Sequence, residues 1–524
     1  MTATENIPMR TISNPITEKK LYEINDADPE TIKNSFAKAK KIQAAIRNLS
    51  VKERVNEILK INDYLIEHRE NILTRIIEET GKSRFDALSS ELFEICDVID
   101  YFKGAAPKIL ETKNVHTPIV LMGKKSKIFF EPLGTVLVIT PWNYPLYQAL
   151  VPSFLAFLSG NAVIVKPSEV TPLKGLIEEI LEKSSFLKDA IQVVYGGKET
   201  GKMLIENRPD KIHFTGSVGS GKKIMEQASQ NLIPVDLELG GKDAALIFDD
   251  VNIERTANGI MWGAFTNCGQ SCTSIERVYV QEKIYDDFVK FLSEKISKLN
   301  SSSEKRNYKS PEDCDIGSMT TEFQSKTIES HLQDAVLKGA KVIFGGKRED
   351  GKMHFPPTLL THVNHEMKIM TDETFGPVLP VMKFKTEEEG VALANDSIYG
   401  LSASVWSKDL NRAERVAHRL EVGNVSINSH MLTEANPALP FGGVKQSGFG
   451  RLKSDHGLLS FCNIKSIIID VQGKKIEPHW YPQTPTKYKM LSDLMVALFS
   501  RSKNWVRFAL IGLKLDNIGT KEKI

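Results

Sequence analysis

The clearest indication of the fold is Thr135-Val136-Leu137-Val138-Ile139-Thr140, an uninterrupted run of apolar and β-branched residues. Similar runs recur at 162–166, 191–195 and 211–215, with helical patterns between them. Strands that are apolar throughout and alternate with helices indicate a parallel sheet with helices packed on both faces. The sequence therefore predicts an α/β fold whose first sheet ends near residues 235–237.

The segments on either side of this core are less regular. A second set of strand and helix patterns runs from 244 to 420, and residues 29–110 have helical spacing of apolar residues. Residues 116–122 and 127–130 predict a hairpin, and 466–470 predict one more strand. Residues 1–20 are polar and are expected to be a flexible lead-in.

Length and composition exclude several classes of protein. The chain has 524 residues, which is too long for one ordinary core, so two or three domains are expected. Its net charge of +2 gives no overall attraction to nucleic acid. The five cysteines are scattered, which favours a reducing, cytoplasmic setting, and no cluster near Cys268 and Cys272 completes four zinc ligands. No metal site is predicted.

Two residues between 237 and 273 suggest covalent catalysis. Cys272 is a candidate nucleophile, because a thiolate is strongly nucleophilic and is partly populated near neutral pH. Glu238, in Leu-Glu-Leu-Gly-Gly-Lys at 237–242, is a candidate base, since a desolvated glutamate has a raised pKa and can take a proton from water.

Two of the predicted strands end in polar residues. Asn143, after the first strand, could donate to an oxyanion, although Pro-Trp-Asn-Tyr-Pro at 141–145 could equally be a turn that stops the strand. Lys166 and Glu169 follow the next strand and could hold the hydroxyls of a ribose, with Glu169 favouring NAD over NADP; a solvated charged turn is the alternative.

The glycine-rich segment 214–223 predicts a strand-to-helix turn that offers backbone N–H groups to a phosphate. It fails as a Walker A motif, because Lys223 stands where Ser or Thr should bind magnesium. It also fails as a dinucleotide fingerprint, because Ile224 stands where the third glycine should be. Farther along, Glu373 and Phe375 in residues 373–377 could hold a second ribose and pack on a nicotinamide, or form a turn with a core phenylalanine.

Taken in order, these segments resemble the NAD(P)-dependent aldehyde dehydrogenase superfamily, over about residues 30–470. The resemblance is carried by PWNYP at 141–145, KPSE at 166–169, FTGSVGSG at 214–221, LELGGK at 237–242, GQSC at 269–272, ETFGP at 373–377 and PFGGVKQSGFG at 440–450. It implies a Rossmann-like cofactor domain, an α/β catalytic domain and a small β element for oligomer formation.

The resemblance also implies roles for individual residues. Cys272 would attack the aldehyde, Asn143 would hold the oxyanion of the thiohemiacetal, and Glu238 would activate the water that hydrolyses the thioester. Relatives that transfer the acyl group to coenzyme A typically lack this base, so hydrolysis is expected. The expected cofactor is NAD, with NADP possible, and the implied contacts are Trp142, Lys166, Glu169, Gly216, Ser217, Gly221, Glu373 and Phe375.

The implied domain organisation has four parts. Residues 1–111, 132–237 and 438–461 would bind NAD, residues 238–437 would form the catalytic domain, and 112–131 with 462–485 would supply oligomerisation strands. A homodimer or homotetramer is expected. Residues 486–524 exceed the usual end of the family.

Two segments bear on partners. Residues 429–439 would line the substrate entrance and hold no Lys or Arg for a substrate carboxylate, which favours apolar aliphatic or aromatic aldehydes. The extension at 486–524 mixes apolar and basic residues and contains Trp505, so it could contact a membrane surface, a neighbouring subunit or the substrate entrance. Its apolar runs are far shorter than the ~20 residues needed to span a bilayer.

Three rival functions were considered. Glu238 disfavours a coenzyme A-acylating or phosphorylating relative, and Lys223 disfavours a P-loop ATP-binding protein. A catalytically silent binding protein is disfavoured because Cys272, Glu238 and Asn143 are all present.

Overall fold

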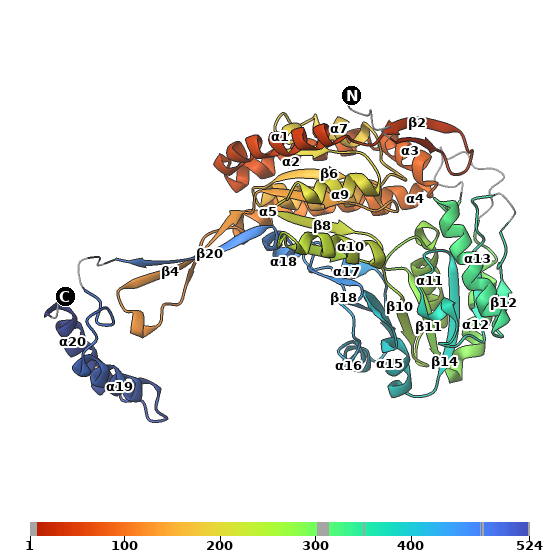
Figure 1. Cartoon of the computed structure of the whole chain (residues 1–524). Coiled ribbons are helices and arrows are strands. Elements are labelled where there is room, and N and C mark those ends of the chain that lie inside the picture. Colours follow the sequence, from red (N-terminus) through yellow and green to blue (C-terminus); the bar gives the residue numbers. More distant parts are fainter. Residues whose placement is uncertain (1–7, 301–313, 349–351, 472, 474–475, 522–524) are drawn as a thin grey trace. The chain divides into compact units, whose positions relative to one another are not determined.

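Two sheets organise the larger part of the protein (Figure 1). The computed structural model describes residues 8–300, 314–348, 352–471, 473 and 476–521. The chain divides into unit 1, Met1–Glu111 with Phe130–Ile464, and unit 2, Thr112–Phe129 with Lys465–Ile524.

The first sheet of unit 1 has the strand order β19-β9-β8-β5-β6-β7. All neighbours are parallel except β19, which runs antiparallel to β9. Every residue of β5, β6 and β8 is buried, as their apolar sequences predict. The bounds are β5 Thr135–Ile139, β6 Ala162–Lys166, β7 Ile191–Val193, β8 Lys211–Thr215, β9 Val235–Glu238 and β19 Gly448–Phe449.

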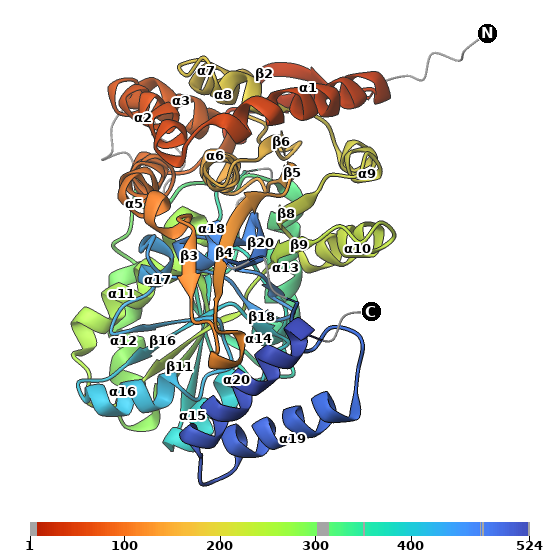
Figure 2. The ribbon, with the colours of Figure 1, turned by 90° about the vertical axis from the view of Figure 1, so that its left-hand side faces the viewer.

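Helices lie on both sides of this sheet. Figure 2 shows α9 and α10 on one side of the strands and α5 and α6 on the other. Their bounds are α5 Glu94–Ile109, α6 Pro145–Leu158, α9 Lys198–Glu206 and α10 Val218–Ser229. The sequence-based prediction of a parallel sheet covered on both faces is confirmed.

The helical segment near the N-terminus also forms as predicted. Its helices are α1 Pro29–Asn48, α2 Val51–Glu67 and α3 Arg69–Thr80. Ser50 and Glu53 form a capping box that starts α2. The expectation of a flexible lead-in is wrong for the part that is described, because β1 (Met9–Ser13) pairs antiparallel with β2 (Lys20–Asn25). Residues 1–7 lie outside the described residues.

The second sheet of unit 1 has the order β12-β13-β14-β11-β10-β16-β17, parallel except for β12. Its strands are β10 Asp243–Ile247, β11 Ile275–Gln281, β12 Lys341–Phe344, β13 Thr358–Thr361, β14 Val378–Phe384, β16 Ser402–Trp406 and β17 Asn424–Ile427. Its helices include α11 Ile253–Phe265, α12 Tyr285–Ile296, α13 Glu322–Leu337, α15 Glu387–Asn395 and α16 Leu410–Ala417. It has its own hydrophobic core, separate from that of the first sheet.

The two sheets are joined directly. β9 ends at Glu238 and β10 begins at Asp243, so only residues 239–242 connect the first sheet to the second. Glu238 is the last residue of β9, directly before this connection. Cys272 lies beside the connection in space, since a Cβ atom built at Gly241 would come within 2.3 Å of the Cys272 carbonyl oxygen.

Unit 2 contains a small sheet and two helices. The sheet has the order β20-β4-β3, with β3 Lys113–Val115, β4 Lys124–Pro132 and β20 Cys462–Asp470. The predicted hairpin is present, but its first strand lies at 113–115 and not at 116–122. Residues 113–115 pair with β4, whereas Pro118 precedes a 3-10 turn at Ile119–Leu121. Proline lacks an N–H and fits turns better than sheet interiors, which explains the shift.

The C-terminal extension is helical. α19 (Pro485–Phe499) and α20 (Trp505–Lys521) pack against each other, and an ion pair of 3.0 Å joins Arg507 to Asp493. Among the described residues, no helix is both long enough and apolar enough to cross a membrane.

Candidate active site

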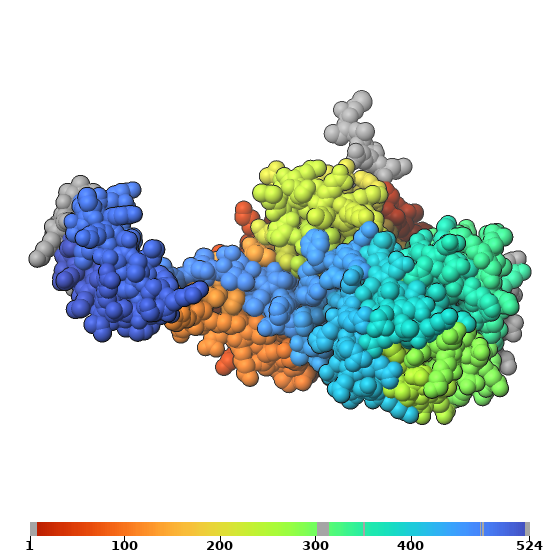
Figure 3. All heavy atoms as spheres, turned by 90° about the horizontal axis from the view of Figure 1, so that it is seen from below, coloured from red at the N-terminus to blue at the C-terminus, as the bar shows by residue number. Residues whose placement is uncertain are grey.

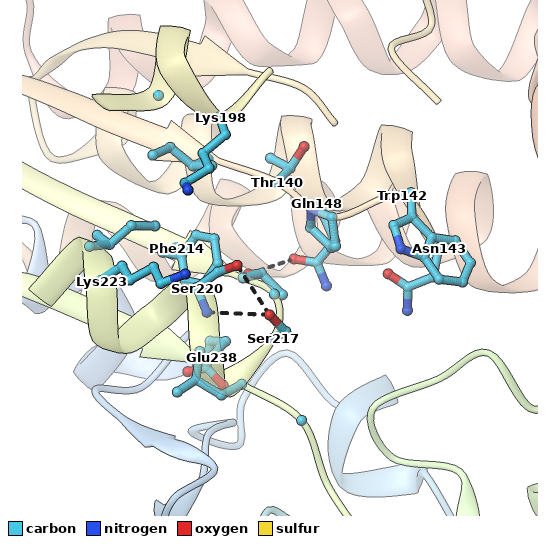
Figure 4. A pocket seen from close by; sticks show the side chains of 18 of the residues that line it. Thr140, Trp142, Asn143, Gln148, Lys198, Phe214, Ser217, Ser220, Lys223 and Glu238 are labelled. Atoms are coloured by element: carbon cyan, nitrogen blue, oxygen red, sulfur yellow. Dashed lines mark hydrogen bonds between the residues drawn. The ribbon is translucent and has the colours of Figure 1, made fainter. Parts of the chain in front are cut away.

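A cavity of about 620 Å³ in unit 1 collects most of the predicted site residues. Ten of the eleven line it: Trp142, Asn143, Lys166, Glu169, Gly216, Ser217, Glu238, Cys272, Glu373 and Phe375. The close-up in Figure 4 shows Trp142 and Asn143, Ser217 and Ser220, and Glu238 around the same space. Segments up to 233 residues apart in sequence thus meet at one site.

Gly221 is the exception. It is buried in the first turns of α10, and a Cβ atom built there would come within 2.7 Å of Leu239. Its lack of a side chain lets α10 approach the segment after β9. The structure therefore places this predicted cofactor contact at a packing position outside the lining of the cavity.

Glu238 has an unusual environment for a carboxylate. It is 5% exposed, and neither of its oxygens has a hydrogen-bond partner among the described residues. Burial, with the nearby Asp236 as a lesser cause, raises its pKa well above the ordinary value. This confirms the direction predicted from the sequence.

Cys272 differs from the sequence-based expectation. Burial, followed by the charges of Glu434 and Asp243, raises the pKa of the Cys272 thiol well above its usual value. The expectation of a partly populated thiolate near neutral pH is therefore wrong for this arrangement of side chains. The desolvation that suits Glu238 as a base also keeps the neighbouring thiol protonated.

A strained turn leads into Cys272. Asn267 and Cys268 have φ angles of 50° and 57°, a region that non-glycine residues rarely occupy. Hydrogen bonds hold this turn: Asp86 accepts from the Asn267 N–H at 3.0 Å, and the Asn267 amide donates to the Gln270 carbonyl at 3.0 Å. Cys268 is fully buried in the second core, where it packs among apolar side chains.

The Asn143 side chain is held over the same turn. Its amide N–H donates to the Gln270 main-chain carbonyl at 3.0 Å, and the main-chain carbonyl of Asn143 accepts from Lys82 at 2.8 Å. Lys82 also forms a buried ion pair of 2.8 Å with Glu91. Glu91 in turn accepts from the Leu146 N–H at 3.0 Å, near the start of α6. This network fixes the turn between β5 and α6.

A second buried ion pair fixes the other side of the cavity. Lys242 and Glu276 lie 2.6 Å apart and are almost completely buried. The Glu276 carboxylate also accepts from the Thr374 and Phe375 N–H groups, each at 2.7 Å. Neither ion pair was predicted. The Lys in Leu-Glu-Leu-Gly-Gly-Lys was visible in the sequence, but its partner lies 34 residues away.

The rest of the cavity suits an elongated ligand that carries phosphates. Ser217 caps α10, accepting from the Ser220 N–H at 3.3 Å, and a Cβ atom at Gly219 would meet no atom within 4 Å. The first turn of this helix therefore offers open N–H groups. Lys166, whose pKa is lowered by burial, lies 3.3 Å from Glu169.

Aromatic rings and a carboxylate lie at the other end. Trp142 and Phe375 are in edge contact, with ring centroids 5.4 Å apart. Glu373 accepts from the Gly241 N–H at 3.0 Å, and burial, reinforced by Glu276, raises its pKa to about 8. An uncharged or charged Glu373 can accept from ribose hydroxyls, so the residues present fit a dinucleotide.

A second, smaller cavity also touches Cys272 and Glu238. It is lined by Tyr147, Gln148, Thr215, Leu239, Leu401, Glu434, Phe441 and Leu452. Glu434 accepts from the Thr273 hydroxyl at 2.7 Å, directly after the cysteine. Sequence reasoning noted the absence of Lys and Arg from 429–439 but missed the consequence of Glu434.

A buried lysine does approach this region from another segment. Lys453 is fully buried, donates to the Glu434 main-chain carbonyl and lies 3.7 Å from Glu94. Burial raises the pKa of Glu94 to about 7, and the lysine opposes that shift. The positive charge is thus engaged by protein groups.

Comparison with known proteins agrees with this geometry. A model of the aldehyde dehydrogenase family matches residues 2–467. The 4,4'-diapolycopene aldehyde oxidase of a Methylomonas species is 38% identical over 91% of this chain and 88% of its own length. The chain belongs to the aldehyde dehydrogenase family and is an NAD(P)-dependent oxidoreductase that acts on aldehydes.

Solved structures are similar throughout. The betaine aldehyde dehydrogenase of Staphylococcus aureus, determined with NAD+, has a TM-score of 0.84 and 32% identity, covering 92% of this chain and 97% of its own. An NADP-dependent enzyme of E. coli has a TM-score of 0.83 and 31% identity, covering 88% and 95%. The fold is therefore that of the aldehyde dehydrogenases, as the sequence predicts.

Proposed function

We propose that the protein oxidises aldehydes to carboxylic acids through a thioester on Cys272 that water hydrolyses. The observation that carries this proposal is Glu238, a buried carboxylate with a raised pKa and unpartnered oxygens, in the same cavity as the cysteine. Such a group is suited to take a proton from water. A relative that hands its acyl group to coenzyme A has no need of it.

In the proposed mechanism, the Cys272 thiol releases its proton to water and the sulfur bonds to the aldehyde carbon, giving a thiohemiacetal oxyanion. The Asn143 amide and the Cys272 N–H stabilise the oxyanion. When bound, the cofactor would supply the oxidised nicotinamide ring that accepts the hydride from the former aldehyde carbon, which leaves a thioester on Cys272. Glu238 then removes a proton from the water that attacks the thioester carbon, and the C–S bond breaks to release the acid and the thiol.

The cofactor contacts we propose follow the family resemblance, and all of them except Gly221 line the cavity. Lys166 and Glu169 would hold the adenosine ribose, and Gly216 with Ser217 would face the pyrophosphate. Glu373, Phe375 and Trp142 would hold the nicotinamide ribose and ring. Gly221 would act only through the packing of α10. Residues 1–111, 132–237 and 438–461 would form the NAD-binding domain, and 238–437 the catalytic domain.

The substrate we propose is an apolar aliphatic or aromatic aldehyde, in an activity of the broad aldehyde dehydrogenase type (EC 1.2.1.3-like). Leu401, Phe441 and Leu452 in the smaller cavity support an apolar substrate. The carboxylate of Glu434 disfavours an anionic one. The name of the relative that oxidises 4,4'-diapolycopene aldehyde is compatible with this choice.

We further propose a homodimer or homotetramer that assembles through residues 112–131 and 462–485. Exposed isoleucines on β20, at 467–469, support this assignment, because apolar side chains left exposed on both faces of a strand favour association.

The decisive experiment compares Cys272→Ala and Glu238→Gln with the wild type. Cys272→Ala should abolish NAD reduction by every aldehyde. Glu238→Gln should still release about one equivalent of NADH per site in a burst, while kcat falls about 10²–10⁴-fold, because only hydrolysis needs the base. Rapid-mixing absorbance at the NADH band measures both.

Cys96→Ala serves as the control, because Cys96 is partly buried in α5 and does not line the cavity. It should retain full turnover. Full steady-state turnover in Glu238→Gln, or turnover only with coenzyme A, would contradict the hydrolytic mechanism.

A further inference from the structure

We propose that the helical pair α19–α20 is a docking surface for a membrane that contains anionic lipids. The pair lies beyond residue 467, where the match to the family ends. The helical pair is therefore not needed to complete the sheets or the cavity of unit 1. The composition of its surface points to a different role.

The first observation is charge. Counted on the whole sequence, unit 2 has fifteen Lys and Arg against five Asp and Glu, a net charge of +10. Since the chain as a whole carries +2, the remaining residues carry −8. Residues 485–521 include seven basic and two acidic residues; Lys487 is buried, and Arg507 pairs with Asp493, which leaves five further basic residues in this segment. Such a surface is attracted to anionic lipid head groups.

The second observation is an apolar stripe on each helix. Tyr488, Leu491, Met495 and Phe499 recur every three or four residues of α19 and are all exposed. Because this spacing matches the helical repeat, they lie on one face. Ala497, on the opposite side of the helix, is buried, and so is Leu498, which borders the stripe beside Leu491.

The stripe on α20 has the same character. Val506, Leu510 and Leu513 lie on one face and are 72%, 56% and 63% exposed. Leu515 is buried at 7%. Each helix thus keeps some apolar side chains inside the unit and leaves a complete stripe in water. The residues of α19 and α20 are among the dark blue spheres in Figure 3.

The third observation is the placement of aromatic and basic residues. Trp480, Tyr481 and Trp505 are exposed near the starts of the two helices, and Lys503 lies 5.9 Å from the Trp505 ring centre. Exposed Trp and Tyr beside Lys and Arg are typical of segments that lie at a membrane interface. Together with the short helix length, this favours lying on a bilayer over crossing it.

Delivery of an apolar aldehyde from the bilayer would rest on the proposed function, whereas the docking itself does not. A second copy of the chain is the other possible occupant. The charge and the interfacial aromatics favour lipid, and the experiment separates the two.

The test uses the full-length protein with vesicles of phosphatidylcholine alone or with about 30 mol % phosphatidylglycerol. The wild type should float with the anionic vesicles and be released by about 0.5 M NaCl. Val506→Ser, Leu510→Ser and Leu513→Ser combined should weaken binding at least about tenfold. Arg501→Glu with Lys503→Glu should remove the preference for phosphatidylglycerol.

The matched control combines Leu337→Ser, Ile398→Ser and Leu410→Ser, which are equally exposed in unit 1. It should bind vesicles like the wild type. All variants should oxidise a water-soluble aldehyde at the wild-type rate, so a failure of docking is distinguishable from a failure of the catalytic proposal.

The proposal is overturned if the wild type stays unbound to anionic vesicles, or if the triple α20 variant binds them unchanged. It is also overturned if that variant lowers the mass measured by light scattering while no form binds vesicles. That last result would assign the surface to a second copy of the chain.

Discussion

At the residue scale, the main feature of the candidate active site is that three of its titratable side chains are buried away from solvent. Glu238, Cys272 and Glu373 all line one cavity, and burial is the largest cause of the raised pKa of each. Shifts of this kind concentrate at functional sites because catalysis needs groups that change protonation near the working pH.

These shifts determine the expected pH dependence. In the proposed mechanism both Cys272 and Glu238 must lose a proton to act, and burial raises the pKa of each, so the deprotonated fraction of each grows as the pH rises. The kcat/KM for a neutral aldehyde should therefore rise from pH 6 to above pH 8 and level off only in the alkaline range, as a profile between about pH 5 and 10 would show. A profile already flat at pH 6 would contradict the buried environment.

Glu434 makes a separate prediction about specificity. Glu434→Gln keeps a hydrogen-bond acceptor for Thr273 and removes a negative charge beside Cys272. The kcat/KM for succinate semialdehyde, relative to that for hexanal, should rise about tenfold, because a like charge no longer repels the substrate. Steady-state kinetics with both aldehydes measure the ratio, and exposed Glu388→Gln provides the control. An unchanged ratio would exclude Glu434 from selectivity.

At the element scale, the site is held by two buried lysine–glutamate pairs. Lys82–Glu91 fixes the turn between β5 and α6, and Lys242–Glu276 fixes the segment before β14. In both pairs, the lysine balances the charge of the glutamate, and the carboxylate oxygens also accept hydrogen bonds from main-chain N–H groups. These contacts thereby anchor the loops that carry Asn143 and Phe375.

Lys242→Met tests this arrangement. The change leaves Glu276 buried without its counter-charge, which should lower the free energy of unfolding by about 3–5 kcal/mol. Because residues 373–375 lose their anchor, KM for NAD should rise as well. Urea unfolding and cofactor titration measure the two effects.

The control for this prediction is Lys383→Met. Lys383 pairs with Glu282 at 3.2 Å, but both side chains are about half exposed, so the loss should be at most about 1 kcal/mol. If both variants lost the same free energy of unfolding, burial of the Lys242–Glu276 pair would not be what makes Lys242 important for stability.

The elements also show what could be predicted from the sequence. Residues 135–139 and 162–166 were identified because uninterrupted β-branched runs have few alternatives to a buried strand. The sequence does not mark β13, β16 and β17 as strands. Short segments such as Ser402–Trp406 mix small polar and apolar residues, although all five residues of that strand are buried. Their strand character comes from the neighbouring strands in the sheet, which the local pattern does not contain.

The candidate site was predicted more completely than the groups that support it. Ten positions could be named because their motifs follow strands and resemble those of a known family. Glu276, Glu91 and Lys453 were not, because nothing local distinguishes a buried charged residue from a solvated one. The raised pKa of Cys272 is not predicted for the same reason, as it depends first on burial and then on the charges of Glu434 and Asp243, which are distant in sequence.

At the scale of the whole molecule, assembly is the property to test. Ile468 on β20 is 57% exposed, in the segment to which we assign oligomer formation. Ile468→Glu should shift the mass from light scattering towards that of the monomer, since a charge on an apolar strand face opposes association. Ile343→Glu, on strand β12 and 43% exposed, should leave the mass unchanged. A wild-type-like mass for Ile468→Glu would place the interface elsewhere.

The protonated thiol of Cys272 has a consequence for the durability of the protein. Peroxides and alkylating reagents attack thiolates far faster than thiols, so a nucleophile with a raised pKa is chemically quiet until substrate is present. Burial of Cys272 in the cavity should therefore slow its oxidation relative to that of a thiol with an ordinary pKa.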